Sequence, residues 1–315
     1  MKKILLLSIL LFPLSRLAAQ DDKATTPDSL KTWKRGGTFT MNFTQASYSN
    51  WAAGGINSIS GQMLVSTFVN YKKGLTTWDN TLDLAYGVMQ QSTSALVKKT
   101  DDKIDFSSKY GRSFSKDWNY SALFGFKTQF QPGYNYQGDT AKTLISDIMS
   151  PGYMLLAIGV DYKPNDKFSL LMSPMTGRIT FVEDPTLADA GAFGVKAAVR
   201  DAAGNIITPG EHRRYEFGSY IRAQYKAEVM KNVTLGARLE LFSNYLKNPQ
   251  NVDVNADLLV TMKVNKFISA SLNLSGIYDD DIMIAYASHH DGVIDSKGPR
   301  FQFRQVIGVG FTAQF

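Results

Sequence analysis

Apolar and polar residues alternate with a period of two along most of the chain beyond residue 36. In residues 61–71 the odd positions are mostly apolar and the even positions mostly polar, and the same alternation recurs in residues 118–130, 233–245 and 252–264. Successive side chains of an extended strand project to opposite faces, so this pattern predicts β-strands with one apolar face and one polar face. An amphipathic helix would instead repeat its apolar positions every three or four residues.

About twelve segments carry this pattern, an even number of the kind found in bacterial outer-membrane barrels. Most are longer than the roughly five or six residues of an ordinary globular strand, and their length suits a tilted crossing of a bilayer. The predicted strands are residues 37–48, 58–72, 76–91, 103–115, 118–131, 152–163, 167–181, 213–229, 232–246, 251–264, 267–279 and 300–315.

The connections between these strands alternate between short and long. Tight turns lie at residues 72–74, 115–117, 164–166, 230–232 and 264–266, and longer connections at residues 91–102, 131–151, 182–212 and 279–299. Short periplasmic turns and long extracellular loops are typical of outer-membrane barrels, whereas a soluble β-sandwich has no reason to alternate so regularly. We therefore predict an all-β fold, a transmembrane antiparallel β-barrel of about twelve strands.

Aromatic residues gather near the ends of the predicted apolar faces. Tryptophan and tyrosine suit the headgroup level of a membrane because each ring joins an apolar body to a polar group. Any single one is equally explained by the preference of aromatic residues for strands, so their position at strand ends is what favours the membrane. The residues concerned are Trp78, Tyr86, Tyr110, Trp118, Tyr162, Tyr215, Tyr225, Tyr245 and Tyr278.

The start of the chain predicts export. Two lysines precede an apolar run at residues 4–14, and two alanines follow at positions 18 and 19, which is the layout of a secretory signal peptide. An anchoring helix is the weaker alternative, because Pro13 interrupts the run and a spanning helix needs about 20 apolar residues. We expect a signal peptide at residues 1–19, a periplasmic N-terminal segment at 20–36 and a single outer-membrane barrel at 37–315.

Composition narrows the function classes. The chain contains no cysteine, which excludes disulfides, thiolate metal sites and a lipid on an N-terminal cysteine. The net charge of +6 is spread along the chain rather than gathered in a basic run, so nothing predicts a nucleic-acid partner.

The last strand resembles the C-terminal targeting strand of outer-membrane proteins. It alternates apolar positions, carries a glycine and ends in an aromatic residue, here Gly310, Phe311 and Phe315. Ala313 departs from the stricter form, in which a second aromatic residue is often found. The resemblance implies recognition by the barrel-assembly machinery and insertion among the lipids of the cell outer membrane.

The connection between the first two predicted strands contains Asn50, Trp51, Gly54 and Gly55, preceded by Gln45. This Gln-x4-Asn-Trp-x2-Gly-Gly stretch, followed by barrel strands to the end of the chain, resembles an outer-membrane family of Bacteroidota catalogued as domain of unknown function 3078. The resemblance implies a barrel and supplies no activity or catalytic residues. Because glycines permit positive φ or a close backbone approach, a shape-setting hairpin is the favoured interpretation, and a recognition loop built on Asn50 and Trp51 is the alternative.

Charged residues lie opposite the apolar faces, where they would point into the lumen of a closed barrel. Facing lipid, each would cost several kcal/mol near the midplane of the membrane. Their mixed signs favour ion pairs between strands, so a narrow or occluded lumen is favoured over an open channel. The candidate lumen charges are Lys103, Asp105, Lys109, Glu216, Arg222, Arg238, Glu240, Asp253, Asp257 and Arg304.

Other candidate chemistry is weaker. The His289-His290-Asp291 stretch and the aspartates at 279–281 offer ligands for a divalent cation, but their spacing matches no metal motif, so a solvated loop is the preferred interpretation. Ser288 beside His289 is adjacent only in sequence. Ser29 and Thr140 follow aspartates in short stretches that resemble the O-glycosylation acceptor of Bacteroidota. We predict no catalytic, metal-binding or cofactor-binding residues.

Two non-enzymatic functions remain. The first is a narrow passage for small polar solutes, and the alternative is a structural or assembly partner in the envelope with an occluded lumen. A barrel enzyme acting on lipid is less favoured, because no nucleophile and base stand in a recognisable motif. A passage predicts that lumen charges set ionic selectivity, whereas a partner predicts that loops or the lipid face determine co-purification.

Overall fold

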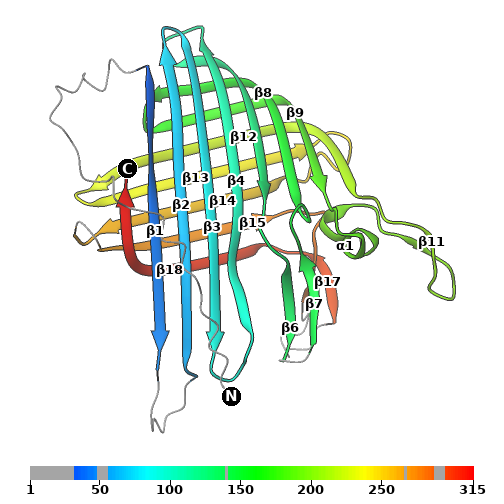
Figure 1. Ribbon diagram of the computed structural model, residues 1–315. Helices are drawn as coiled ribbons and strands as arrows, with labels where there is room; N and C mark the ends of the chain where they lie inside the picture. Colours follow the sequence, from blue (N-terminus) through cyan, green and yellow to red (C-terminus); the bar gives the residue numbers. More distant parts are fainter. Residues whose placement is uncertain (1–31, 48–55, 139–140, 266–267, 287–294) are drawn as a thin grey trace.

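The computed structural model describes residues 32–47, 56–138, 141–265, 268–286 and 295–315. Twelve strands form a closed antiparallel barrel in the order β1-β18-β15-β14-β13-β12-β9-β8-β5-β4-β3-β2 (Figure 1). The prediction of an antiparallel barrel of about twelve strands is confirmed. Their bounds are β1 Trp33–Ala46, β2 Ser58–Lys73, β3 Thr76–Gln91, β4 Val97–Ser113, β5 Trp118–Thr128, β8 Gly152–Asn165, β9 Phe168–Phe181, β12 Arg213–Met230, β13 Val233–Asn244, β14 Asp253–Lys263, β15 Ile268–Tyr278 and β18 Gln302–Gln314.

Predicted and observed strands differ mainly at their ends. Strand β1 begins at Trp33, so residues 33–36 belong to the barrel wall rather than to the N-terminal segment predicted at 20–36. The ring of Trp33 lies 4.9 Å from that of Tyr71, which joins the two strands on the outer face. Strand β4 begins at Val97 rather than at residue 103, because a bulge lets its ladder with β3 continue.

The two ends of the barrel differ in their connections. At the short-turn end, β2 and β3, β8 and β9, and β12 and β13 are each joined by two residues, 74–75, 166–167 and 231–232. At the long-loop end, the connections contain elements that the alternation did not predict. These are the hairpins of β6 (Gly133–Gln137) with β7 (Ala141–Ser146), β10 (Val199–Arg200) with β11 (Ile206–Thr208) and β16 (Met283–Tyr286) with β17 (Ser296–Pro299), the helix α1 (Pro185–Asp189) and the 3-10 turn η2 (Ala192–Gly194). No helix in the described residues is long and apolar enough to cross a membrane.

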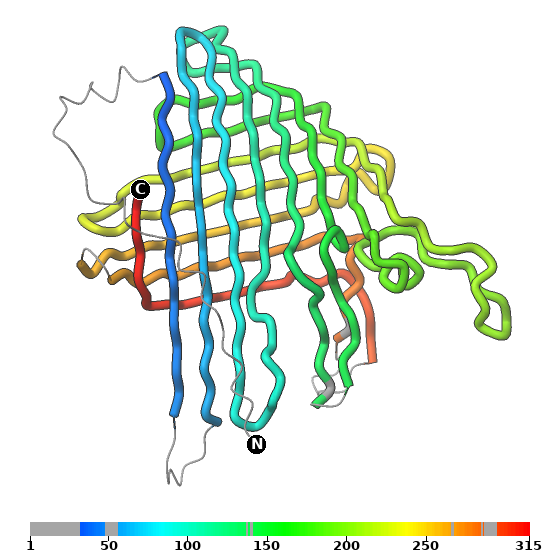
Figure 2. Tube along the Cα trace, in the orientation of Figure 1, coloured from blue at the N-terminus to red at the C-terminus, as the bar shows by residue number. Residues whose placement is uncertain are grey.

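The barrel has two facing walls. Strands β1 to β4 run along one wall, and β12 to β15 cross behind them (Figure 1). Strand β18 joins the walls, because its first part pairs with β15 and its last part with β1. Figure 2 shows the bend, where the red C-terminal segment turns to run along β1. A Cβ on Gly310 would lie 2.1 Å from the carbonyl oxygen of Met41, so glycine permits this close approach.

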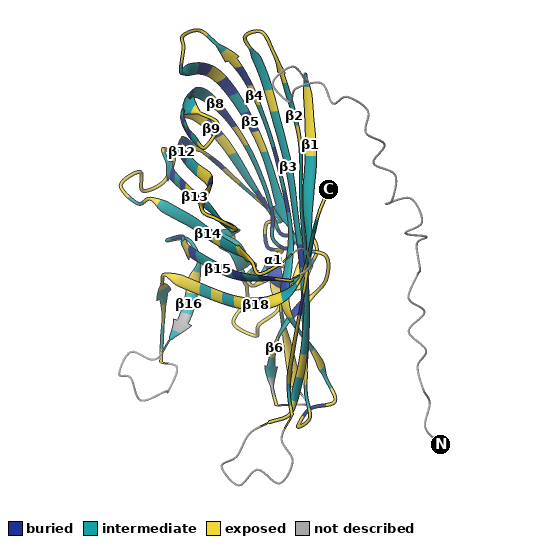
Figure 3. Ribbon diagram, turned by 90° about the vertical axis from the view of Figure 1, so that its left-hand side faces the viewer, coloured by how far each residue is buried: buried dark blue, intermediate teal, exposed yellow. Residues whose placement is uncertain are grey.

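Apolar side chains cover the outside of the barrel. On β8, the outward Leu156 and Ile158 are 51% and 53% exposed, whereas the inward Ala157 between them is fully buried. Along β18, exposed positions drawn in yellow alternate with less exposed positions drawn in teal (Figure 3). Lipid contact requires such an inside-out arrangement, with an apolar outer face and polar groups turned inward.

Several predicted features lie outside the described residues. They are the signal peptide, the Asn50, Trp51, Gly54 and Gly55 loop, the His289-His290-Asp291 stretch with Ser288, and the possible acceptors Ser29 and Thr140.

Candidate functional site

All ten candidate lumen charges take part in ion pairs. The shortest contacts join Lys127 and Glu240 at 2.6 Å, and Arg178 to both Glu216 and Asp253 at 2.6 Å. The other candidate charges pair as Lys103 with Asp105, Lys109 with Asp161, Arg222 with Glu240, Arg238 with Asp105 and Asp257, and Arg304 with Asp101.

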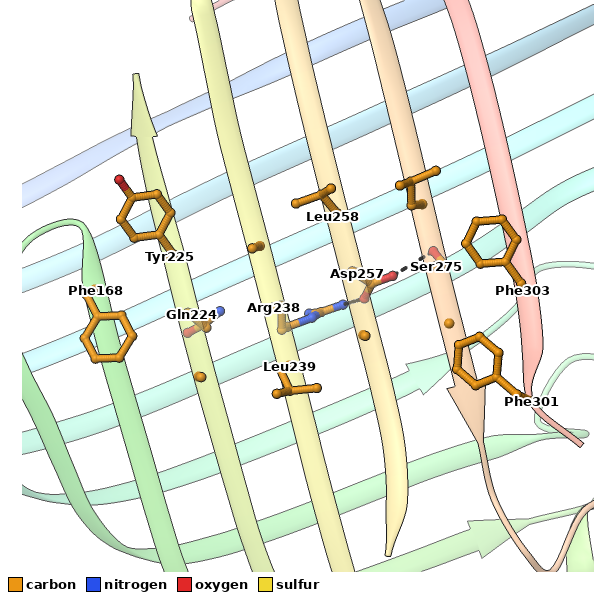
Figure 4. Close-up of a pocket in the computed structure, with 15 residues that line it drawn as sticks. Phe168, Gln224, Tyr225, Arg238, Leu239, Asp257, Leu258, Ser275, Phe301 and Phe303 are labelled. Carbon is orange, nitrogen blue, oxygen red and sulfur yellow. Dashed lines mark hydrogen bonds and ion pairs between the residues drawn. The ribbon is translucent and has the colours of Figure 1, made fainter. Parts of the chain in front are cut away.

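Ion pairs connect opposite walls at the middle of the barrel. Arg238 on β13 reaches Asp105 on β4 at 2.9 Å and Asp257 on the neighbouring β14 at 2.7 Å. Lys127 on β5 reaches Glu240 on β13 at 2.6 Å. Arg238 and Asp257 lie in one row across β13 and β14, and strands of the opposite wall cross behind them (Figure 4). These five residues, together with Arg222, are called the central network.

Hydrogen bonds add to the central network, and the Nε atom of Arg222 has no hydrogen-bond partner among the described residues. The Tyr220 hydroxyl donates to Glu240 at 2.9 Å, and Nη1 of Arg222 donates to the Ser107 hydroxyl of β4 at 2.8 Å. Asp105 and Arg222 are only 3% and 6% exposed. Buried charges are tolerated only when they are paired and hydrogen-bonded, so Asp105 and Arg222 belong to a buried polar core. The side chains of Lys127 and Asp257, at the edge of this core, are 31% and 26% exposed.

An apolar cluster lies inside the barrel beside the central network. Leu123, Ala157, Leu171, Tyr220 and Phe242 are buried together, with Leu155 packed against them. They come from five strands, β5, β8, β9, β12 and β13. The sequence analysis missed this cluster, although Leu123 gave a signal, because it is an apolar residue on the otherwise polar face of its strand.

A cavity of about 540 Å³ lies between the central network and the long-loop end. Its lining includes Arg222 and Glu240 of the central network, Tyr153 of β8, and Phe193 of η2. Phe193 has a φ of 56°, in the left-handed region that bulky residues rarely adopt. Nearby residues of the same connection, including Val182 and Leu187, form a second buried cluster, which positions this segment at the mouth of the cavity.

Acidic and basic groups alternate at the mouth. Arg178 binds Glu216 and Asp253, and Arg214 binds Glu216 at 3.0 Å and Asp281 at 2.7 Å. These arginines explain why Glu216 can be buried as a charged group. The sequence analysis missed both arginines, although each occupies a polar position of an alternating strand.

Three carboxylates meet beside these arginines. Oxygen atoms of Asp253, Asp279 and Asp280 lie within 4.8 Å of one another. Burial raises the pKa of Asp279 above its ordinary value. Burial acts in the same direction on Asp281, but the ion pairs with Lys247 and Arg214 hold its pKa below the ordinary value. The structure thus separates the consecutive aspartates considered as metal ligands into two electrostatic environments.

A second hollow, of about 380 Å³, lies on the outer face of the far wall. The hollow exists because small residues line it, and larger side chains at these positions would occupy the space. The aromatic rings of Phe168, Tyr225, Phe301 and Phe303 surround it (Figure 4). The small residues are Ala223, Ala237, Ala256 and Gly276. Arg238 and Asp257 also line this hollow, so it lies at the level of the central network.

Two residues of the predicted insertion signal, Gly310 and Phe311, lie on β18, and Phe315 follows the strand and exchanges backbone hydrogen bonds with Gly37 of β1. Gly310 occupies the bend between the walls, and Phe311 and Phe315 are 47% and 65% exposed on the outer face.

Comparison with known proteins gives a family match and distant structural likenesses. The family model described as protein of unknown function (DUF3078) matches residues 43–134, from β1 to β6. This part of the chain therefore matches a family without a known function. No curated protein matches the sequence.

Three solved structures show a distant likeness to this chain. The COG4313 outer membrane channel from Pseudomonas putida F1 is 12% identical, with 89% of this chain and 94% of that chain covered and a TM-score of 0.36. The translocator domain of the autotransporter NalP from Neisseria meningitidis is 12% identical, with 89% and 88% covered and a TM-score of 0.36. The toluene transporter TodX of P. putida is 11% identical, with 91% and 80% covered and a TM-score of 0.31.

Proposed function

We propose that this protein is a non-enzymatic outer-membrane barrel with a narrow passage for small polar solutes, closed at rest by the central network. The observation that carries this proposal is that Asp105 and Lys127 on one wall are ion-paired with Arg238 and Glu240 on the other. The apolar outer face supports the membrane location, and the predicted signal peptide and C-terminal insertion signal support export to the outer membrane.

The central network has the properties of a closure that can open. A solute that enters the cavity from the long-loop end meets Arg222, Arg238 and Glu240 on its lining. Buried ion pairs add little net stability over apolar packing of the same volume, because desolvation offsets their attraction. When these ion pairs separate, water and a polar solute can hydrogen-bond to the charged groups in place of their partners, at a modest cost in free energy. Apolar side chains packed in the same space would offer no such exchange.

The second candidate function is a structural or assembly partner with a permanently occluded lumen. The apolar cluster around Leu123 and Leu171 favours it, because these side chains offer a polar solute no hydrogen bonds. Here the long-loop hairpins would contact the partner.

Permeation of a pentose into proteoliposomes separates the two functions. The double variant Lys127→Gln/Glu240→Gln removes both charges of one pair between the walls and keeps the side-chain volumes. The control Lys196→Gln/Glu211→Gln removes an exposed pair, 3.9 Å apart, in the long connection between β9 and β12. A closed passage predicts faster swelling for the first variant only. Equal, slow swelling of wild type and both folded variants would support the occluded partner instead.

A further inference from the structure

The first and last strands of the barrel pair with each other over only part of their length. Strands β1 and β18 pair over five positions, from Thr38 with Gln314 to Asn42 with Gly310, whereas β2 and β3 pair over sixteen. Beyond Asn42, β1 continues to Ala46 while β18 pairs with β15 alone. Among the described residues, no backbone hydrogen bond joins the facing edges Phe43–Ala46 and Gln302–Val309. We call this opening the seam notch.

The seam notch lies within the apolar band of the outer face. Phe43 on one edge is 56% exposed, and Ile307 and Val309 on the other are 68% and 58% exposed. The outward positions of β18 remain mainly apolar from Phe303 to the C-terminus. Because hydrocarbon cannot hydrogen-bond to free backbone groups, an open edge at this depth requires an occupant with polar groups of its own.

The seam notch leads to the lumen cavity. Gln302 and Arg304 of β18 line that cavity, and the Arg304 side chain is 39% exposed. Beside the notch, Asn42 is 5% exposed, and its Oδ1 atom has no hydrogen-bond partner among the described residues. Its Nδ2 atom donates to Gln62, which donates to Asp101, the ion-pair partner of Arg304. A row of polar groups therefore lines the inner side of the opening.

The charges accessible there are positive. The Lys103 and Arg304 side chains are 35% and 39% exposed, whereas the carboxylates that they pair with, Asp105 and Asp101, are 4% and 7% exposed. A molecule that enters the notch meets an ammonium and a guanidinium group, with the carboxylates hidden behind them. This arrangement favours an anion.

We propose that the seam notch is a lateral binding site for an anionic amphiphile, a molecule with a carboxylate or phosphate head and a hydrocarbon tail. The head lies against Arg304 and Lys103, where it also accepts hydrogen bonds from free N–H groups of β18. The tail leaves between Phe43 and Ile307 into the membrane. This route runs sideways through the wall into the same cavity as the proposed passage, but binding at the notch does not require the passage along the barrel axis to open.

Binding is measured by calorimetry on the full mature chain in lipid nanodiscs, with empty discs subtracted. The probes are dodecanoate and dodecyl phosphate, which distinguish a carboxylate head from a phosphate head. Dodecyltrimethylammonium tests the charge and butanoate tests the tail. We expect saturable binding of at least one dodecyl anion and none of either control. Equal binding of the cationic amphiphile, or no saturable binding of either dodecyl anion, would overturn the proposal.

Variants locate the head group. Lys103→Gln and Arg304→Gln should each weaken binding by about tenfold or more, because each removes one charge-assisted contact. Lys103→Gln keeps the inference testable if Arg304→Gln does not fold, since the Lys103 side chain is 35% exposed and its ammonium group lies 3.5 Å from Asp105. Lys263→Gln, at the short-turn end, should bind as wild type does. Unchanged affinity in Lys103→Gln would contradict the assignment.

A labelling experiment tests the opening itself without relying on conductance. The chain has no cysteine, so single cysteines can be introduced at two lumen-facing positions of β1. Thr44→Cys lies beside the notch, and Thr40→Cys lies where β1 is paired with β18. Thr40 lies 3.0 Å from Thr312 across the seam. A bimane label at position 44 should be quenched by lipids spin-labelled on the acyl chain, and one at position 40 should not. Equal protection at both positions would show that the seam is closed.

Discussion

Replacing Leu123 by alanine tests whether the middle of the lumen is a packed core. Leu123 and Leu171 are each 1% exposed and touch neighbours inside the barrel. In a water-filled channel, an inward leucine would be solvated before and after folding, and its truncation would change the free energy of unfolding very little.

The expected loss follows from the packing. Leucine to alanine removes three carbon atoms, worth about 0.8 kcal/mol each when they are transferred out of water. The cavity left behind adds about 1 to 2 kcal/mol if its neighbours relax only partly. We therefore expect Leu123→Ala and Leu171→Ala each to lower the free energy of unfolding by about 3 to 4 kcal/mol.

The assay is reversible urea unfolding in lipid vesicles, followed by tryptophan fluorescence and by the shift of the folded band on unheated gels. Leu246→Ala is the control, because Leu246 is 70% exposed in the connection after β13, and its truncation should change stability by less than about 0.5 kcal/mol. Losses below about 1 kcal/mol for both inward leucines would refute the packed core and favour a hydrated lumen.

Three further predictions concern the bend, the mouth and its titration. Gly310→Ala should reduce the yield of folded barrel, because its Cβ would lie 2.1 Å from a backbone oxygen, whereas Gly177→Ala, with nothing within 4 Å of its Cβ, should fold normally on unheated gels. Arg178→Met leaves the buried Glu216 with one fewer partner and should cost about 3 to 5 kcal/mol in urea unfolding, whereas Lys196→Met should cost almost nothing. Asp279→Asn should stabilise the protein at pH 7, because burial disfavours the ionised carboxylate in the folded state and so raises the pKa of Asp279. The gain in stability should vanish below the unfolded pKa of about 3.9, where the carboxyl group is protonated in both states. A variant less stable than wild type at pH 7 would contradict this prediction.

The barrel could be predicted from the sequence because its wall depends on a local rule. Strands such as β8 and β18 alternate apolar and polar residues, and each alternation assigns an outer and an inner face without reference to other strands. The short turns add the antiparallel order. The hairpins at the long-loop end were missed because their strands are short and carry little alternation, as the two residues of β10 show.

The lumen could be predicted only in part. Mixed charges on the inner faces indicated ion pairs, but which residues pair depends on the distance between opposite walls, as for Asp105 and Arg238, which are 133 residues apart. The same reason explains why the apolar cluster around Leu123 was missed, since one inward leucine has meaning only when its partners from four other strands are known. The seam notch depends on the bend of β18, which an isolated glycine does not specify.

Single-channel conductance of the refolded mature protein in a planar bilayer tests the closed passage most directly. Wild type should show almost no stable conductance, whereas Asp105→Asn/Arg238→Gln, which removes one of the two ion pairs between the walls and leaves the net charge unchanged, should give discrete steps. Large, steady steps from wild type, indistinguishable from those of the variant, would contradict the account, because they would mean that the central network does not close the lumen.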